Sequence, residues 1–384
     1  MTFNKLSSDE RERIKLAEWR ISKAKNFEEA DRVPVQIRVA NPFFCWALGY
    51  TFNDYYRNWD VCRFVQIEGP KWAFKNLGDD RAPVPYDAWL NKIEEYPLPD
   101  IGSVGEGIVF GCEIVLPDNE HPWTTPWIIP KFKTLEDIDK LEVPDPRECE
   151  KRLMEHIRRA YGKEIPLPKG TVPKIHPPLS AAGSLMGAEN LFTFLYKHPN
   201  EMHKFLEKLY KTYCVLKDYE DDQRGQESRT LNLADDHAGY LNVNMYKKFV
   251  LPYNKKLYER YGREKRRLHM DSKSDHIAHI IVEEYKLNEM DLGSSQFTDI
   301  AKIKKEFYNK VFFNGNLDTR LLVSGSEEEI KKGVEYCIYH AAPGGGYAFD
   351  VGGETFANID ISKLKFAIEY AKKIGKYPIK IENF

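Results

Sequence analysis

Several common signatures of function are missing from this chain of 384 residues. It has no G-x-G-x-x-G sequence and no Walker loop, and its glycine run, Pro343–Gly346, precedes an expected strand rather than a helix. Backbone cradles for nucleotide phosphates need glycines between a strand and the following helix. We therefore do not expect a nucleotide-binding site of either type.

Cysteine is scarce and scattered. The six cysteines form no C-x-x-C pair and no closely spaced framework. This pattern is typical of reduced thiols in a reducing compartment and argues against a Cys-rich zinc or iron–sulfur site. No apolar run approaches the roughly 20 residues of a membrane helix, and the N-terminus lacks the apolar core of a signal peptide. We expect a cytoplasmic protein.

An excess of charge of one sign is also absent. The 57 basic and 59 acidic side chains leave a net charge of −2. No overall field then attracts nucleic acid or an anionic membrane, so neither is expected as a partner. The substrate has to be inferred from local features.

Aromatic residues, in contrast, are plentiful. The chain has 22 Tyr, 21 Phe and 7 Trp, and many of them lie in the first 130 residues. They are suited to lining a pocket around a planar ligand. A large aromatic core explains them equally well, so the sequence leaves both interpretations open.

The order of expected elements indicates an α/β fold, a (β/α)8 TIM barrel with N-terminal helical and hairpin additions. Residues 1–30 predict a helical cap, and residues 31–384 a single barrel domain with an aromatic-rich insertion at 41–130 that includes a hairpin around 107–116. After Pro146 strands and helices alternate, which implies parallel strands with crossover helices. The expected strands are 32–39, 172–175, 230–234, 267–270, 289–292, 311–314 and 347–350.

Several of these strands end in polar residues that suit one cup-shaped active site. His269 and Asp271 are two apart, so in a strand they face the same way. Asp236 and His237 follow another strand and are further catalytic candidates, although they suit a helix N-cap too. Polar groups at barrel strand ends commonly serve catalysis, but turn formation explains some of them equally well. The expected substrate-contacting residues are Asn316, Asp318, Tyr347, Asp350, Glu113 and His176.

The motif order resembles the uroporphyrinogen decarboxylase superfamily, whose fold is a TIM barrel. The resemblance runs from about residue 30 to 375 and rests on four stretches. They are Leu233–Gly239 before Pro252-Tyr253, Leu268–Asp271, Phe313–Asp318 and Gly345–Gly353.

Departures from the superfamily pattern favour one of its two chemistries. True decarboxylases carry an arginine-rich N-terminal motif for the substrate carboxylates, and here only Arg38 is basic. A histidine usual in the final glycine-rich loop is replaced by Gly353. The other branch, the corrinoid-dependent methyltransferases, includes thiol-methylating enzymes with a zinc site of the form His-x-Cys plus a distant Cys.

This chain has oxygen groups where the thiol-methylating enzymes have thiolates. Asp271 takes the place of the first Cys, and Gly353, beside Glu354, takes the place of the second. An oxygen-rich site suits an ether oxygen better than a thiol. The resemblance thus implies demethylation of methoxylated aromatics. His269, Asp271 and Glu354 would hold zinc or act without it as a hydrogen-bonded acid pair, and both alternatives stay open.

We expect a methyltransferase that cleaves a methyl ether and passes the methyl group to the cobalt(I) corrinoid of a separate protein. A separate protein is needed because the cobalamin-binding pattern D-x-H-x-x-G is not met: Gly239 falls one residue early. Pro343–Gly346 is the candidate mobile loop for docking. The alternatives are a decarboxylase of a porphyrinogen-like or smaller carboxylated substrate, and a non-catalytic tetrapyrrole-binding module. By analogy with related barrels, the protein would form a homodimer.

Overall fold

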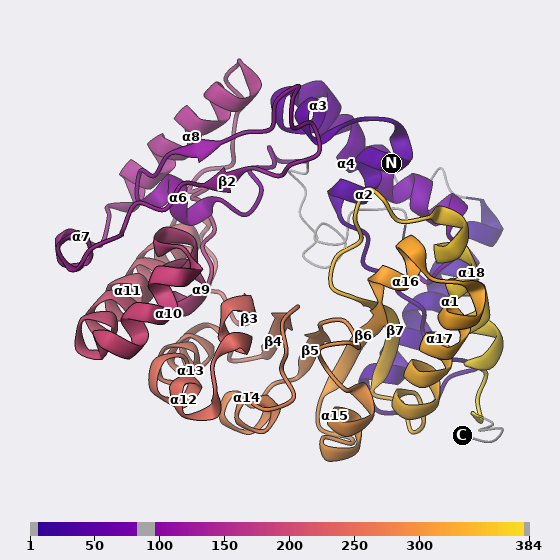
Figure 1. Cartoon of the computed structure of the whole chain (residues 1–384). Coiled ribbons are helices and arrows are strands. Elements are labelled where there is room, and N and C mark those ends of the chain that lie inside the picture. Colours follow the sequence, from indigo (N-terminus) through magenta and orange to yellow (C-terminus); the bar gives the residue numbers. More distant parts are fainter. Residues whose placement is uncertain (1–6, 83–96, 380–384) are drawn as a thin grey trace.

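The computed structural model describes residues 7–82 and 97–379, so parts of the expected cap (1–6) and insertion (83–96) lie outside the described residues. Five parallel strands form one sheet in the order β3-β4-β5-β6-β7. Figure 1 shows these strands in the lower half of a ring, with their helices outside, most N-terminal elements in the upper half and α1 at the right beside α17. The strands are β3 (Thr230–Ala234), β4 (Lys265–Met270), β5 (Glu289–Leu292), β6 (Phe312–Asp318) and β7 (Tyr347–Gly352).

Helices surround the sheet as a (β/α)8 barrel requires, which confirms the predicted fold class. Each strand of the sheet follows a helix in the chain, so the connections are long enough for parallel neighbours. The helices of this half are α9 (Pro178–Met186), α10 (Ala188–Lys197), α11 (Pro199–Arg224), η2 (Asp236–Tyr240), α12 (Val243–Phe249), α13 (Leu251–Tyr261), α14 (Ala278–Tyr285), α15 (Ile300–Glu306), α16 (Thr319–Ser324), α17 (Glu327–Ala341) and α18 (Ile361–Ile374).

The N-terminal half is less regular. Its elements are α1 (Ser8–Lys25), α2 (Asn41–Leu48), α3 (Phe52–Arg57), α4 (Trp59–Asn76), α6 (Gly105–Val109), β1 (Ile114–Val115), β2 (Trp127–Ile128), α7 (Leu135–Lys140) and α8 (Pro146–Tyr161). Helix α1 closes the barrel at the end where the strands begin, because Ile21 and Ala24 pack on Phe312 and Ala348. None of the described helices combines the length and apolarity needed to cross a bilayer.

Two expected strands lack a regular ladder. The segment 32–39 is extended and joins β7 through a parallel bridge between Val35 and Phe349, and the segment 172–175 is extended without a strand ladder. Pro34 and Pro173 are the physical reason, since proline has no N–H to donate to a ladder. The segment 32–39 still lies beside β7, and the segment 172–175 lines a cavity together with β3.

Three other local predictions were wrong. The hairpin expected around 107–116 is instead the helix α6, and β1 pairs with β2 across a longer connection. The helix expected over 245–261 is divided into α12 and α13, because Pro252 lies in the first turn of a new helix. The loop Pro343–Gly346, expected to dock a partner, precedes β7, where the Gly346 N–H donates to Ala24 of α1. It therefore lies at the end of the barrel opposite the strand C-termini.

Candidate active site

Polar side chains fill the inside of the barrel in tiers. Alternate residues of a strand face the same side, so Lys265, Arg267 and His269 of β4 all point inward. Lys265 pairs with Glu289 of β5 at 2.6 Å, and one tier higher Arg267 pairs with Asp291 at 2.6 Å. The third tier, above them, is open to solvent at the strand C-termini. We call this end, formed by Arg38, His176, Asp236, His269, Asp271 and Glu354, the mouth.

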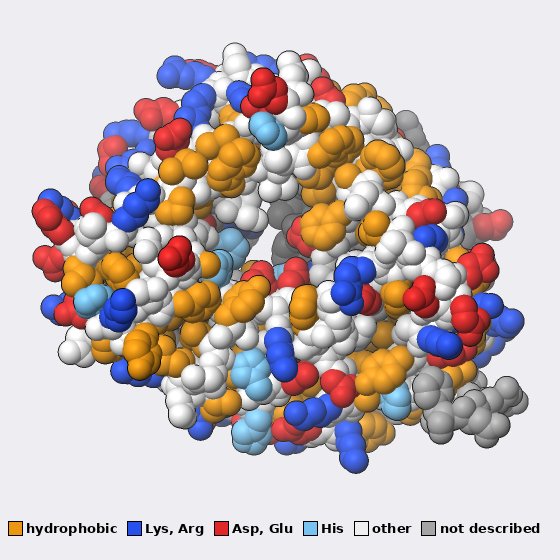
Figure 2. Space-filling view, in the orientation of Figure 1, with side chains coloured by type: hydrophobic (Ala, Val, Ile, Leu, Met, Phe, Trp, Pro, Cys, Tyr) orange, Lys and Arg blue, Asp and Glu red, His pale blue; other side chains and the backbone are white. Residues whose placement is uncertain are grey.

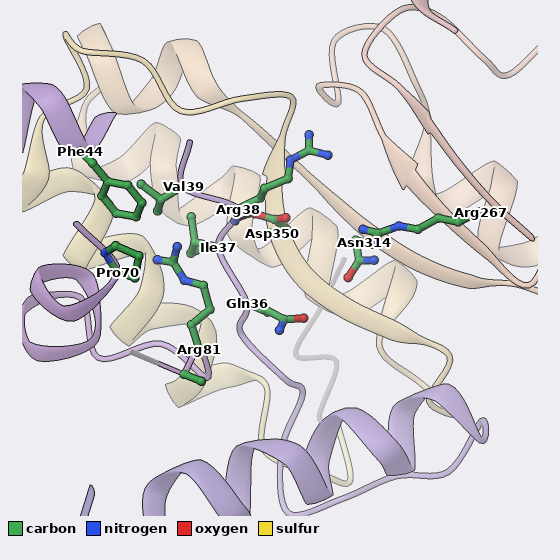
Figure 3. Close-up of a pocket in the computed structure, with 11 residues that line it drawn as sticks. Gln36, Ile37, Arg38, Val39, Phe44, Pro70, Arg81, Arg267, Asn314 and Asp350 are labelled. Carbon is green, nitrogen blue, oxygen red and sulfur yellow. Dashed lines mark hydrogen bonds between the residues drawn. The ribbon is translucent and has the colours of Figure 1, made fainter. Parts of the chain in front are cut away.

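Below Arg38 the barrel interior is nearly filled. A cavity of about 40 Å³ lies beside Arg38, Arg267, Asn314 and Asp350, which is room for one or two waters. Figure 3 shows Arg267 reaching toward Asn314 and Asp350 from the opposite wall. There is more room at the other wall, where a cavity of about 380 Å³ is lined by the segment 172–177, which includes His176, and by β3.

Arg38 holds the mouth together. Its Nη1 donates to His269 Nδ1 at 2.8 Å and to Asp291 Oδ2 at 3.2 Å, and its Nη2 donates to the Gly353 carbonyl at 3.1 Å. Its Nη2 also lies 3.6 Å from Asp271 Oδ1. Burial opposes the charged guanidinium, but Asp291, Asp350 and Asp271 outweigh it and raise the pKa of Arg38. Arg38 therefore stays cationic.

The contact with Arg38 assigns the tautomer of His269. A guanidinium can only donate hydrogen bonds, so Nδ1 must accept and the ring proton must be on Nε2. Nε2 lies 3.2 Å from Asp271 Oδ1. Burial opposes ionisation of Asp271, but the nearby His269 and Arg38 outweigh it and lower the pKa of this carboxyl. His269 thus presents an N–H beside an ionised carboxylate at the mouth.

Asp291 supports this arrangement from below. Its side chain is buried, and it accepts from Arg267, Arg38 and Asn314. Burial disfavours the charged carboxyl, but Arg267 and Arg38 outweigh it and lower its pKa to about 2. Asp350 lies alongside, where burial raises its pKa to about 7 against the effect of Arg38. Asp350 Oδ1 accepts from the Arg38 backbone N–H at 2.8 Å, so it positions Arg38.

A second pair, Glu106 and His176, lies on the other wall. Glu106 Oε1 accepts from the His176 backbone N–H at 2.6 Å and contacts its Nδ1 at 2.5 Å. Gly105 brings the two segments together, because a Cβ there would come within 1.7 Å of the Lys174 carbonyl oxygen. Burial opposes protonation of His176, but Glu106 outweighs it and raises the pKa to about 9. His176 is therefore an imidazolium at neutral pH.

Of the three residues Asp235 to His237, only Asp236 points into the mouth. Asp235 is fully buried, accepts from Ser180 and Asn254 at 2.7 Å each, and has a pKa raised to about 6 by burial. Asp236 points into the mouth and accepts from the Asp271 backbone N–H at 2.6 Å. The His237 ring packs on Gly183 of α9, where a Cβ would come within 2.5 Å of it. Burial lowers the pKa of His237, so this ring is neutral.

Four of the expected substrate-contacting residues lie away from the mouth. Asn316 donates to the carbonyls of Gly293 (3.0 Å) and Thr298 (2.8 Å), because Gly315, at φ +132°, re-aims the end of β6. Asp318 caps α16. The buried Tyr347 hydroxyl donates to the Gly315 carbonyl, and Glu113 is exposed beside β1. Asp350 and His176 are the two that the structure brings to the mouth or directly beneath it.

The residues offered for a metal ion do not fit zinc as they stand. Asp236, His269 and Asp271 place one ligand atom each within 4.8 Å of one another, and Glu354 is not in this set. A zinc ion on His269 Nε2 needs the ring proton on Nδ1, where Arg38 already donates. Burial raises the pKa of Glu354 and outweighs the effects of Arg38 and His269, which lower it. We therefore derive no chemistry through zinc.

Comparison with known proteins identifies the family. The family model described as Uroporphyrinogen decarboxylase (URO-D) matches residues 101–374. The chain belongs to this family. Among curated relatives, it is 26% identical over 239 residues to the uroporphyrinogen decarboxylase of Shewanella piezotolerans, covering 58% of this chain and 65% of that protein.

Other relatives agree on the family and on the fold. The URO-D of Klebsiella pneumoniae is 25% identical over 303 residues, covering 76% of this chain and 80% of that protein. A solved methyltransferase from Methanosarcina mazei superimposes with a TM-score of 0.64 at 14% identity, covering 93% of this chain and 98% of that one. At this identity the superposition supports the barrel fold alone.

Sequence reasoning missed two residues that shape the mouth. Glu106 lies 70 residues before His176, directly before the stretch that the sequence assigns to a hairpin. Asp291, in the middle of β5, has no motif around it. An inward position on a buried strand was the available signal for Asp291, since a buried carboxylate needs a charged partner.

Proposed function

We propose that this URO-D family protein is a methyltransferase that cleaves a methyl ether, with a methoxylated aromatic as the substrate class. The observation that carries the proposal is the pair of N–H donors at the mouth, His269 Nε2 and the His176 imidazolium. Ether cleavage leaves an electron pair on the departing oxygen. The enzyme therefore has to supply hydrogen-bond donors and a proton to that atom.

The charge of the mouth argues against a polycarboxylate substrate. Of the six mouth residues, Arg38 is the only arginine, and both of its Nη atoms already donate, to His269, Asp291 and Gly353. Asp236, Asp271 and Glu354 are acidic. A porphyrinogen with many carboxylates needs several free arginine forks and an absence of competing carboxylates. A neutral methyl ether needs no arginine forks and is not repelled by the carboxylates of the mouth.

Three side chains of the mouth act in the proposed reaction. His269 donates its Nε2–H to the ether oxygen, and Arg38 behind the ring favours the negative charge that grows there. As the carbon–oxygen bond breaks, its electron pair stays on oxygen and the methyl carbon passes to the acceptor. His176 then supplies the proton, since a pKa of about 9 is close to that of a phenol, about 10 for Tyr.

The rim of the mouth suits an aromatic substrate and a protein partner. Helix α2 begins directly after the Arg38 segment, and its Trp46 is 46% exposed; Phe356, in the loop that follows β7, is 53% exposed. Trp46 packs edge-on against Trp123 at 5.8 Å. Figure 2 shows hydrophobic side chains over this upper half and acidic and histidine side chains around the central opening. Large exposed apolar surfaces commonly mark binding sites.

The methyl acceptor in this proposal is a separate corrinoid protein that docks on the mouth. In its cobalt(I) state a corrinoid is a nucleophile strong enough to take a methyl group from an ether. The Pro343–Gly346 loop cannot take part, because it lies at the opposite end of the barrel. Among the described residues, the loop that follows β7 and carries Phe356 is the better candidate for contact with the partner.

The test is a two-substrate assay. Purified protein is incubated with a methoxylated aromatic carrying an isotope-labelled methyl group, with and without a reduced corrinoid protein. We expect a phenol and transfer of label only when both are present. Phenol formed at the same rate without corrinoid contradicts the proposal.

A second function, decarboxylation, is favoured by the names of the curated relatives. The same purified protein is therefore assayed with uroporphyrinogen and smaller aromatic carboxylates. Release of carbon dioxide at a rate that depends on enzyme concentration would establish this alternative in place of methyl transfer.

A further inference from the structure

The surroundings of the Arg38 guanidinium are those of a metal ion. Around it lie an imidazole nitrogen at 2.8 Å, a carboxylate oxygen of Asp291 at 3.2 Å and a backbone carbonyl at 3.1 Å. A second carboxylate, Asp271, follows at 3.6 Å. Imidazole, carboxylate and carbonyl are also the groups with which proteins bind divalent cations.

The position of the guanidinium is fixed by the backbone on either side. The Arg38 N–H donates to Asp350, and the N–H groups of Ile37 and Ala40 donate to Asp79 and Thr355. The Thr355 hydroxyl donates back to the Arg38 carbonyl at 3.4 Å. Arg38 therefore enters the mouth from an anchored segment rather than from a free surface loop.

A bound arginine and a bound metal ion exclude each other here. The cation would share His269 and Asp271 with Arg38, and two positive charges in one cluster repel. The proton that a metal-bound His269 needs on Nδ1 would also point at the Arg38 N–H. Each group thus disfavours the other through both charge and hydrogen bonding.

We propose that Arg38 takes the place of a metal ion in this site: its guanidinium is the built-in cation to which His269, Asp271 and Asp291 are bound. The wild-type protein then works without a divalent metal at the mouth. Removal of the guanidinium should turn the same residues into a metal site. The inference concerns binding alone, so it holds or fails independently of the reaction catalysed.

The experiment compares metal binding in wild type and in Arg38→Met. Met keeps much of the side-chain length but provides neither charge nor donors. Purified proteins are stripped with a chelator, dialysed and titrated with Zn²⁺ by calorimetry and with Co²⁺ by visible absorption. We expect at least about a tenfold gain in affinity for the variant, the lower end of the change seen when a ligand's neighbour is altered.

Two further variants locate the effect. Arg38→Met combined with His269→Ala should lose the gained affinity, because the imidazole ligand is gone. Arg320→Met removes an arginine that pairs with another strand-end carboxylate, Asp318, at 2.6 Å, and should bind no more metal than wild type. Circular dichroism melting of every variant shows whether it is folded.

Wild type alone decides the inference if Arg38→Met does not fold. Weak, non-stoichiometric binding by wild type supports it. Tight binding of about one zinc per chain, or Co²⁺ absorption typical of a protein-ligated ion, overturns it. A folded Arg38→Met with unchanged metal affinity overturns it as well.

Discussion

The two histidines that donate at the mouth differ in the partner behind each ring. His269 has a cation behind it, since Arg38 donates to Nδ1 at 2.8 Å. His176 has an anion behind it, the buried Glu106 at 2.5 Å. The first ring is therefore neutral and offers a hydrogen bond, and the second is charged and offers a proton.

This difference shows how one residue type serves two tasks. The protonation state of a buried imidazole depends on the group that contacts its inner nitrogen. Burial strengthens this dependence because little water screens the interaction. The partners come from distant parts of the chain, 231 residues away for His269 and 70 for His176. The role of each histidine is thus set by tertiary structure and not by its own motif.

Removal of the neutral donor should have the largest effect. We expect His269→Ala to lower kcat for demethylation by about 10²–10³-fold, the loss seen when one donor to a developing oxyanion is removed. The melting temperature should stay close to that of wild type, because a mouth residue adds little to the core. Normal turnover by a folded His269→Ala would assign the donor to another residue.

Removal of the anion behind His176 should have the next largest effect. In Glu106→Gln the amide oxygen still accepts from the His176 backbone, but the charge that raises the pKa is lost. Burial then lowers the His176 pKa, so the ring is neutral at pH 8. We expect about a 10²-fold lower kcat at pH 8, with recovery as the pH falls.

The same variant tests the charge through stability. The raised pKa of His176 contributes stability that is fully present below its ordinary value of 6.5 and is lost as pH rises through about 9. Chemical denaturation of wild type at pH 6 to 10 should show this fall, and Glu106→Gln should not. Glu113→Gln, an exposed carboxyl on the same segment, is the control. Equal slopes in all three proteins would contradict the charged state of His176.

Asn316→Ala should affect stability and leave turnover nearly unchanged. Both amide protons of Asn316 are used by buried carbonyls, so the substitution leaves those acceptors unpaired. We expect a loss of about 1–3 kcal/mol in the free energy of unfolding, measured in urea, and kcat/KM within about threefold of wild type. A large loss of kcat/KM with unchanged stability would instead indicate that Asn316 contacts the substrate.

The regular half of the fold was predictable because pattern and structure agree there. The strands β3 and β5 have the predicted bounds, and β7 extends the predicted one by two residues. These strands are short segments that alternate with longer helices, and this alternation is a clear signal in an α/β sequence. The segments 32–39 and 172–175 were predicted as strands but lack a regular ladder, because Pro34 and Pro173 cannot donate to one. The sequence pattern also does not show whether a ladder partner is available.

The mouth was only partly predictable for a different reason. Motifs at strand ends gave His269, Asp271 and Asp236, because alternation in a strand is local. Asn316 obeys the same pattern but turns to other partners, since Gly315 changes the direction of β6. Tyr347 is the first residue of β7, so it lies at the end of the strand away from the mouth. Glu106 and the role of Arg38 depend on contacts between distant segments, which no local pattern contains.

The most direct test of the account is demethylation by metal-free enzyme. Wild type is stripped with a chelator, its zinc content is measured, and transfer of labelled methyl from a methoxylated aromatic to a reduced corrinoid protein is followed. The account predicts that the stripped enzyme transfers methyl at the rate of the untreated enzyme. Loss of transfer that added Zn²⁺ restores, or no transfer before or after stripping, would contradict it.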